Sequence, residues 1–500
     1  MPRFSRRTFV AGIGAIPFTL WLEKSAKASP GPAFVRHEAN TSEGQAMLKS
    51  YAKAVDQMMN HIAAGEPTNW VFQWYTHFVK GSTTKAAEIA RIYPTSSPNK
   101  ALATDMWDTC QAHNPGENEN FFLPWHRMFV FRFERMIREF SGDDKFALPY
   151  WNYSTPTPSL HGVMPKEFRM KSDPAFGILY VDKRNKPPHP DVNAGDPIDK
   201  GQPGNPLGLG ALAECTYESH GAVEGFCMKL DNGLHGSVHV LVGNTQNMGV
   251  IPWAAFDPVF WMHHCNIDRL WASWNHGGRA NPTDPAWLGQ QFTFADENNN
   301  KVLMKIQDVV DFAKMGYTYD AFEPVPSCKK TPEAIRASAA NVQKRAVVPT
   351  AQTALDRVPV SVALEPPPET PGVPLTQHVA ALQPDKSLYL VVEHLRADVA
   401  PGVLYHVYFD MPKDTPAGQA GSYYIGALHF FGATHHEGSD AAAAAATVPP
   451  KFFSFDVTDV AKRLQAAGKL NAKPTLTIVP SGEPESEAKP IVGGFSLVEQ

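Results

Sequence analysis

Six histidines in two groups constrain the fold of this 500-residue chain more than any other feature. Most of them lie in aromatic-rich stretches whose apolar residues have helical spacing. Neutral imidazole binds copper, zinc, iron and nickel, whereas magnesium and calcium prefer oxygen ligands. The pattern therefore predicts two buried metal sites inside a helix bundle, with three imidazoles each. The two groups are His77, His113 and His126, and then His235, His239 and His264.

The second group shows which histidines share a helix face. His235 and His239 are four residues apart, so both rings project from one side of a helix. His263 and His264 are adjacent, and consecutive helix positions are about 100° apart, so only one of them can face a given ion. His264 is in register with apolar neighbours. We predict that His264 is the ligand, that Asp268 supports it, and that His263 packs at a helix interface.

Residues 1–28 have the features of a twin-arginine export signal. Arg6 and Arg7 precede an apolar run from Phe9 to Leu22, and a small-residue cleavage site ends at Ala28. The apolar run is shorter than the roughly 20 residues that span a bilayer. We expect a periplasmic or secreted protein with no stable membrane anchor.

Composition narrows the class of protein further. The net charge is −5 and no basic run stands out, so a nucleic-acid surface is not expected. Few carboxylates stand beside the six histidines, which disfavours a di-iron or di-manganese site and favours copper and oxygen chemistry. Five cysteines are too few for a disulfide framework. Cys215 and Cys227 bracket a short loop and are placed to pair after export.

Hydrophobic periodicity divides the chain into parts. Residues 40–325 have a mainly helical pattern, which predicts a four-helix bundle around the metal centre. Residues 326–380 are rich in proline and alanine and read as an exposed, protease-sensitive linker. Residues 381–500 contain short β-branched and aromatic runs between turn residues. We therefore expect a mainly α domain followed by an all-β, sandwich-like domain.

Four motifs together resemble the coupled binuclear copper proteins, which are the tyrosinases, catechol oxidases and related hemocyanins. They are FFLPWHR, ALPYWNY, HGSVH and DPVFWMHHCNIDRLW, and the resemblance covers roughly residues 60–325. It implies two copper ions, one held by each histidine group, with dioxygen as the co-substrate. His113 and His126 are farther apart than in most members of the family. Many members join a cysteine by a thioether to the histidine that corresponds to His113. The sequence leaves open whether Cys110 forms this bond.

The resemblance extends to the C-terminal part. GYTY at Gly316–Tyr319 resembles the motif that closes the plant catalytic domain, and YHVYFDM and VGGFSLVE resemble the plant C-terminal domain. In latent plant enzymes that domain covers the copper site until proteolysis. We expect a loop from Tyr423 to Phe431 to supply the plug, and a protease acting near residue 330 to activate the enzyme. A role in stability or subunit pairing is the alternative, and the oligomeric state is open.

The resemblance also implies oxidation of phenolic substrates, with o-diphenols converted to o-quinones. A hemocyanin-like oxygen carrier fits a bacterial export signal less well. Where Gly236 stands, members that hydroxylate monophenols often have asparagine, so diphenol oxidation is favoured. Asp231 either joins a proton-accepting network or is an exposed loop carboxylate, and Ile251 matches the plant gate residue. Monophenol hydroxylation and o-aminophenol oxidation remain open.

Overall fold

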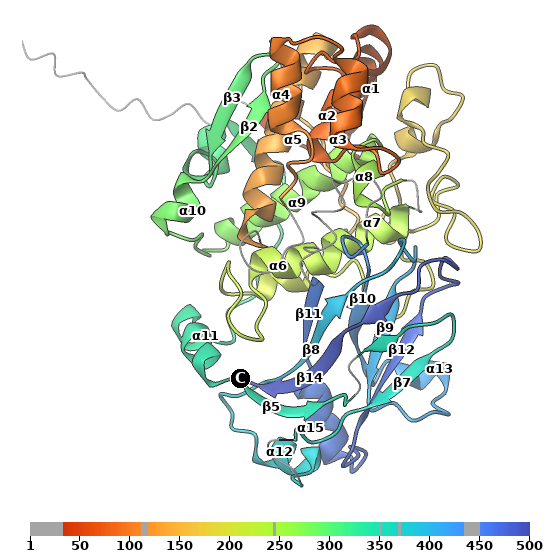
Figure 1. Ribbon diagram of the computed structural model, residues 1–500, viewed down its shortest axis with the longest axis vertical. Coiled ribbons are helices and arrows are strands. Elements are labelled where there is room, and N and C mark those ends of the chain that lie inside the picture. Colours follow the sequence, from red (N-terminus) through yellow and green to blue (C-terminus); the bar gives the residue numbers. More distant parts are fainter. Residues whose placement is uncertain (1–33, 112–118, 244–246, 350–351, 369–371, 435–450) are drawn as a thin grey trace, which may run out of the picture.

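A computed structural model describes residues 34–111, 119–243, 247–349, 352–368, 372–434 and 451–500. The predicted export signal and His113 lie outside the described residues. A helical part forms the upper half of Figure 1 and a β part the lower half, and α6 and α7 lie where the two meet.

The helical part is built around α5, an amphipathic helix that packs against α1 and α9. Helix α5 ends at Gly142, whose φ of 66° is left-handed and carries no steric penalty for glycine. The helices are α1 (Ser42–Asp56), α2 (Trp70–His77), α3 (Lys85–Ile92), α4 (Pro98–Met106), α5 (Phe122–Ser141), α6 (Phe226–Leu230), α7 (Gly236–Val242), α8 (Ile251–Ala254), α9 (Val259–His276) and α10 (Pro285–Gly289).

Two short two-stranded pairings complete the helical part. Strand β1 (Phe34–Arg36) runs parallel to β4 (Tyr317–Tyr319), which ties the beginning of the described chain to the end of the catalytic region. Strands β2 (Gln291–Ala295) and β3 (Lys301–Lys305) form an antiparallel hairpin. Of these two pairings, that of β1 with β4 joins chain segments that are far apart in the sequence.

The β part contains two four-stranded sheets that share a core of their own. This arrangement confirms the expected helical domain followed by a β domain. One sheet has the order β10 (Tyr424–Leu428), β9 (Tyr405–Phe409), β12 (Thr475–Pro480), β7 (Val360–Ala363), and the other β11 (Lys451–Asp456), β8 (Leu388–Leu395), β14 (Gly494–Glu499), β5 (Gln343–Val347). The remaining elements are β6 (Thr353–Ala354) paired with β13 (Ile491–Val492), and helices α11 (Pro332–Ser338), α12 (Leu375–Ala381), α13 (Ala417–Ala420) and α15 (Thr458–Ala466).

The prediction of a linker over residues 326–380 is wrong for much of that range. Strand β5 pairs with β14, and β7 pairs with β12, so both are edge strands of the two sheets. Both strands keep much of their surface in solvent, so neither forms a continuous apolar run that would stand out among the prolines. Residues 326–342 keep an exposed character and contain α11, which packs little of its surface.

The disulfide also differs from the predicted one. Cys215 bonds to Cys328, which lies 113 residues later, and not to Cys227. Cys227 is the second residue of α6 and is fully buried in the helical core. Sequence proximity therefore misled the pairing, because α6 turns Cys227 inward. The bond fastens the chain just before α11 to the helical part.

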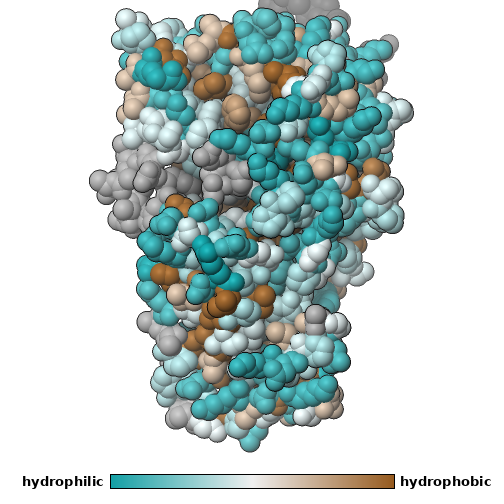
Figure 2. All heavy atoms as spheres, turned by 90° about the vertical axis from the view of Figure 1, so that its right-hand side faces the viewer, coloured by the Kyte–Doolittle hydropathy of each residue, from teal (hydrophilic) through white to brown (hydrophobic). Residues whose placement is uncertain are grey.

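On the face in Figure 2 hydrophilic residues predominate and hydrophobic ones are scattered in small groups. Large apolar side chains at the surface, such as Leu303 and Val358, are isolated examples. Among the described residues, no helix combines the length and apolar character needed to cross a membrane.

Candidate metal centre

The predicted ligands converge from five helical segments in the core. His77 ends α2, His126 lies in α5, and His239 lies in α7. His235 ends the π-helical turn Asp231–His235, which joins α6 to α7. His264 lies in α9, and all five side chains are buried. The structure thus brings together every predicted ligand that lies among the described residues.

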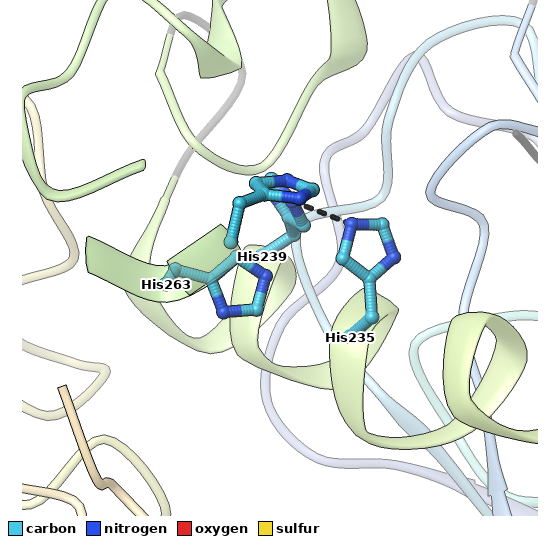
Figure 3. A group of neighbouring side chains, drawn as sticks. His235, His239 and His263 are labelled. Carbon is cyan, nitrogen blue, oxygen red and sulfur yellow. Dashed lines mark hydrogen bonds between the residues drawn. The ribbon is translucent and has the colours of Figure 1, made fainter. Parts of the chain in front are cut away.

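His235 and His239 point at each other with the same ring atom. Their Nε2 atoms are 3.0 Å apart, and a dashed line marks this contact in Figure 3. Nδ1 of His235 is 2.8 Å from Oδ1 of Asp231, and Nδ1 of His239 is 2.8 Å from the carbonyl of Met248. Because each Nδ1–H donates to an oxygen, both Nε2 atoms present lone pairs.

Two facing lone pairs at this distance repel unless a proton or cation lies between them. Burial, followed by the neighbouring His235 and His263, holds the pKa of His239 well below its usual range, so protonation there is disfavoured. A metal ion satisfies both nitrogens, and the oxygen on each Nδ1 is the usual support of a metal-bound imidazole. The donor set therefore fits a soft or borderline metal such as copper.

Both members of the adjacent pair on α9 reach the centre. The ring of His264 lies parallel to that of His126 with centroids 4.3 Å apart, and 5.1 Å from that of His235. The ring of His263 is stacked 5.2 Å from His235, and its Nδ1 is 3.1 Å from the hydroxyl of Tyr153. Figure 3 shows His263 beside His235 and His239.

His263 is therefore more than a helix-interface residue. Its ligand atom belongs to the same compact group as those of His235, His239 and His264. Within the described part of the chain, Nε2 of His263 has no hydrogen-bond partner, and neither ring nitrogen of His264 has one. Two unsatisfied buried nitrogens on one ring are costly without a metal, which favours His264 as the ligand.

The first group consists of His77, Cys110 and His126 among the described residues. Nδ1 of His126 is 2.8 Å from the carbonyl of Phe122, which leaves Nε2 for a metal. The Sγ atom of Cys110 is 3.6 Å from that Nε2. Burial raises the pKa of the Cys110 thiol well above its usual range. The sequence left open whether Cys110 forms a thioether with His113, and His113 lies outside the described residues.

The carboxylates near the site have roles that the sequence only partly indicated. Asp231 is buried and supports His235, so the alternative of an exposed loop carboxylate is wrong. Asp268 does not support His264. It accepts hydrogen bonds from Arg36, Arg127 and two tyrosines, and so ties α9 to α5 and to β4.

The β domain reaches the metal centre through the segment after β10. The ring of Phe431 is stacked on His239 with centroids 4.2 Å apart, and lies 5.8 Å from His235. Nε2 of His429 is 2.8 Å from the carbonyl of Asn232 in the π-helical turn. Both residues belong to the predicted plug loop, but only their packing against the helical part identifies them.

The two other predicted site residues lie close to this contact or in the core. Gly236 begins α7, directly under the imidazole of His429. Ile251 begins α8 and is buried in the core that surrounds the histidines. Their effects on substrate choice stay predictions.

Known families match in the same order as these parts. The common central domain of tyrosinase matches residues 67–186 and 209–277, and the polyphenol oxidase middle domain matches residues 281–333. A domain of unknown function (DUF7868) matches residues 344–500. That last match begins at β5, in agreement with the observed start of the β domain rather than with the predicted one.

Relatives and solved structures agree with this division. A tyrosinase from Hahella sp. (strain CCB-MM4) is 30% identical over 56% of this chain and 62% of its own length. Polyphenol oxidase II of Ipomoea batatas is 29% identical over 63% of this chain and 55% of its own length. The matches thus span less than two thirds of either relative.

In structure, a latent aurone synthase (polyphenol oxidase) covers 94% of this chain and 90% of its own chain, with a TM-score of 0.60 and 19% identity. Latent apple tyrosinase covers 94% of this chain and 98% of its own chain, with a TM-score of 0.57 and 19% identity. At these identities the likeness concerns the fold. The domain order, the fold and the histidine motifs of this chain are thus similar to those of tyrosinases and polyphenol oxidases.

Proposed function

We propose that this protein is a copper-dependent oxidase that converts o-diphenols to o-quinones with dioxygen as co-substrate. The observation that carries the proposal is the pair of buried histidine groups, in which the Nε2 atoms of His235 and His239 lie 3.0 Å apart. One copper would be held by His77, His113 and His126, and the other by His235, His239 and His264. When bound, copper supplies the redox and Lewis-acid chemistry for dioxygen.

The chain's own residues prepare the site for these metals. Asp231, the Met248 carbonyl and the Phe122 carbonyl fix the tautomers of three rings, so each presents Nε2 inward. The rings of Phe122 and Phe260 pack against the histidines and exclude water. A site of this kind accepts a flat, mostly apolar substrate with a few polar groups.

Diphenols fit this site better than monophenols. Hydroxylation of a monophenol needs a group that accepts the phenol proton beside the metal. Gly236 supplies no such group, and one oxygen of Asp231 already accepts from His235. Oxidation of o-aminophenols is the second candidate. These substrates need no prior hydroxylation, so the lack of a proton acceptor at Gly236 does not count against them.

The uncut protein is proposed to be latent. Phe431 covers the face of His239, where a phenol ring would approach, and does so without ligating metal. An activating protease would act in the exposed segment 329–342. The Cys215–Cys328 disulfide supports export to an oxidising compartment, the periplasm or the cell exterior, by the twin-arginine route.

The substrate class is tested by oxygen uptake. Copper-loaded protein, cut within residues 329–342, should consume oxygen on catechol, and more slowly on the matched monophenol. Uptake on o-aminophenol that exceeds uptake on catechol would assign the second candidate. Two bound coppers with no uptake on any of the three would refute the oxidase.

A further inference from the structure

Gly236 lies where the β domain makes its tightest approach to the metal centre. A Cβ atom placed on Gly236 would lie less than 3.0 Å from Cε1, Nε2 and Nδ1 of His429, a spacing that real Cβ atoms do not show. The backbone at Gly236 is ordinary α-helix, with φ of −65° and ψ of −33°. Glycine is therefore required there by the neighbouring ring and not by the helix.

The ring of His429 cannot easily move aside. Its Nε2–H donates to the Asn232 carbonyl, and its Nδ1 lies 3.3 Å from Nζ of Lys451. Lys451 also donates to the Phe431 carbonyl over 2.6 Å. All three β-domain side chains, His429, Phe431 and Lys451, are buried. Lys451 thus connects the ring over Gly236 to the backbone of the residue that covers His239.

The same stretch of the catalytic domain holds the neighbouring strand. Nδ2 of Asn232 donates to the carbonyl of Phe452 over 2.7 Å, and Nζ of Lys229 donates to that of Ser454 over 2.7 Å. The turn before His235 is therefore both a support of the metal site and the docking surface for β11. If His429 moves, Phe431 moves with it, because Lys451 contacts both residues and they are only two positions apart in the chain.

We propose that Gly236 is the position on which the β domain docks through His429. The residue after His235 then determines how strongly the uncut enzyme is inhibited, as well as which substrates it oxidises. This inference rests on the proposed latent oxidase and deepens it. A side chain at position 236 displaces His429, withdraws Phe431 from His239, and opens the site without proteolysis. Substrate choice and autoinhibition are then coupled at a single position.

The test compares four copper-loaded, full-length variants with the wild type: Gly236→Ala, Gly233→Ala, His429→Gly and the double variant Gly236→Ala with His429→Gly. Gly233 lies in the same π-helical turn and nothing lies within 4 Å of its Cβ position, so Gly233→Ala is the matched control. For each protein, catechol oxidation is measured before and after cutting, and the ratio of uncut to cut rate is taken. Withdrawal of copper by cyanide from the uncut protein is measured in parallel.

We expect Gly236→Ala to raise the uncut-to-cut ratio at least about tenfold, which corresponds to about 1.4 kcal/mol of lost docking free energy. Copper should leave this variant faster, while Gly233→Ala behaves like wild type. In the His429→Gly background, Gly236→Ala should have no further effect, because the space is already free. An unchanged ratio and withdrawal rate in copper-replete Gly236→Ala, or an equal effect of Gly233→Ala, would overturn the proposal.

Two possible results, loss of copper from Gly236→Ala and no catechol oxidation by the cut wild type, are covered by the other measurements. If Gly236→Ala binds no copper, His429→Gly alone carries the test, and a ratio equal to that of wild type overturns the proposal. If cut wild type does not oxidise catechol, the proposed function fails. The cyanide rates then still decide the docking role, because they require no turnover.

Discussion

His264 has no hydrogen-bond partner at either ring nitrogen among the described residues, whereas His263 is bonded to Tyr153. We expect the wild type to bind two coppers per chain and the His264→Ala variant to bind about one, because its three-imidazole site is left with two ligands. His263→Ala should retain both. Metal analysis after copper loading and desalting measures this. Loss of copper from His263→Ala and not from His264→Ala would exchange their roles.

Asp231 acts on the second site through His235, whose Nδ1 it holds. Asp231→Ala should weaken copper binding by roughly 10- to 100-fold, as loss of a carboxylate behind a metal-bound histidine does in other proteins. Asp231→Asn keeps an oxygen acceptor and should lose less. Competition with a copper chelator gives the affinities. Equal affinity in wild type and Asp231→Ala would remove Asp231 from the supporting role.

The sequence predicted most ligands because their spacing is a local property. The four-residue step from His235 to His239 places both rings on one face, and the structure brings them together. The position of His263 beside His235 was missed, because it depends on how α9 packs against the other helices. The support from Met248 was also missed, since a backbone carbonyl leaves no trace in the residue type.

At the scale of elements, α9 is fixed by a buried ion pair at its beginning. Arg184 makes two hydrogen bonds of 2.9 and 2.7 Å to Asp257, which also accepts from the backbone N–H of Val259 in the first turn. Arg184→Met leaves a buried, unpaired carboxylate, so we expect a loss of roughly 3–5 kcal/mol of stability. Thermal unfolding of the apoprotein measures it.

The matched control is the exposed pair Lys171–Asp182. Lys171→Met should change stability by about 0–1 kcal/mol, since solvent screens such pairs. A similar small effect for Arg184→Met would mean that α9 is held in place by other contacts.

Some of the β strands could be predicted from the sequence and others could not. Strands β8 and β12 were visible as runs of β-branched and aromatic residues. Strands β5 and β7 were not, because each is an edge strand beside proline-rich chain and only half of its residues are covered. Cys215–Cys328 was equally hidden, since partners 113 residues apart depend on the complete fold.

At the scale of the whole molecule, docking of the β domain should depend on pH through Lys451. Burial lowers the pKa of Lys451 from 10.5 to about 8, against the opposing effects of Asp231 and Glu224. His429 is the other titratable group that it contacts. Between pH 8 and 10.5 the docked state binds fewer protons than the undocked state. Docking is therefore more favourable as pH rises through this window.

We expect the uncut-to-cut ratio of catechol oxidation to fall between pH 8 and 10.5. Taking the ratio at each pH cancels the pH dependence of the chemistry itself. Lys451→Met cannot titrate and should give a flat ratio across the same window. A wild-type ratio that rises with pH, or an equal slope in Lys451→Met, would contradict this assignment.

The arrangement of the two domains explains why the plug could be located only to a loop from the sequence. Residues 423–431 carry aromatic side chains at both ends of the segment, and any of several rings had the right chemistry. The structure selects Phe431 because β10 ends beside α7 and the chain then turns across His239. Contacts between domains have no periodicity that a sequence could display.

The most direct test uses one copper-loaded sample of full-length protein, assayed for catechol-dependent oxygen uptake before and after limited proteolysis within residues 329–342. We predict two coppers per chain throughout, slow uptake before the cut, and a rise in turnover once the β domain has separated from the helical part. Two coppers per chain with equal uptake before and after separation would contradict the shielding by Phe431. No uptake in either state would contradict the oxidase itself.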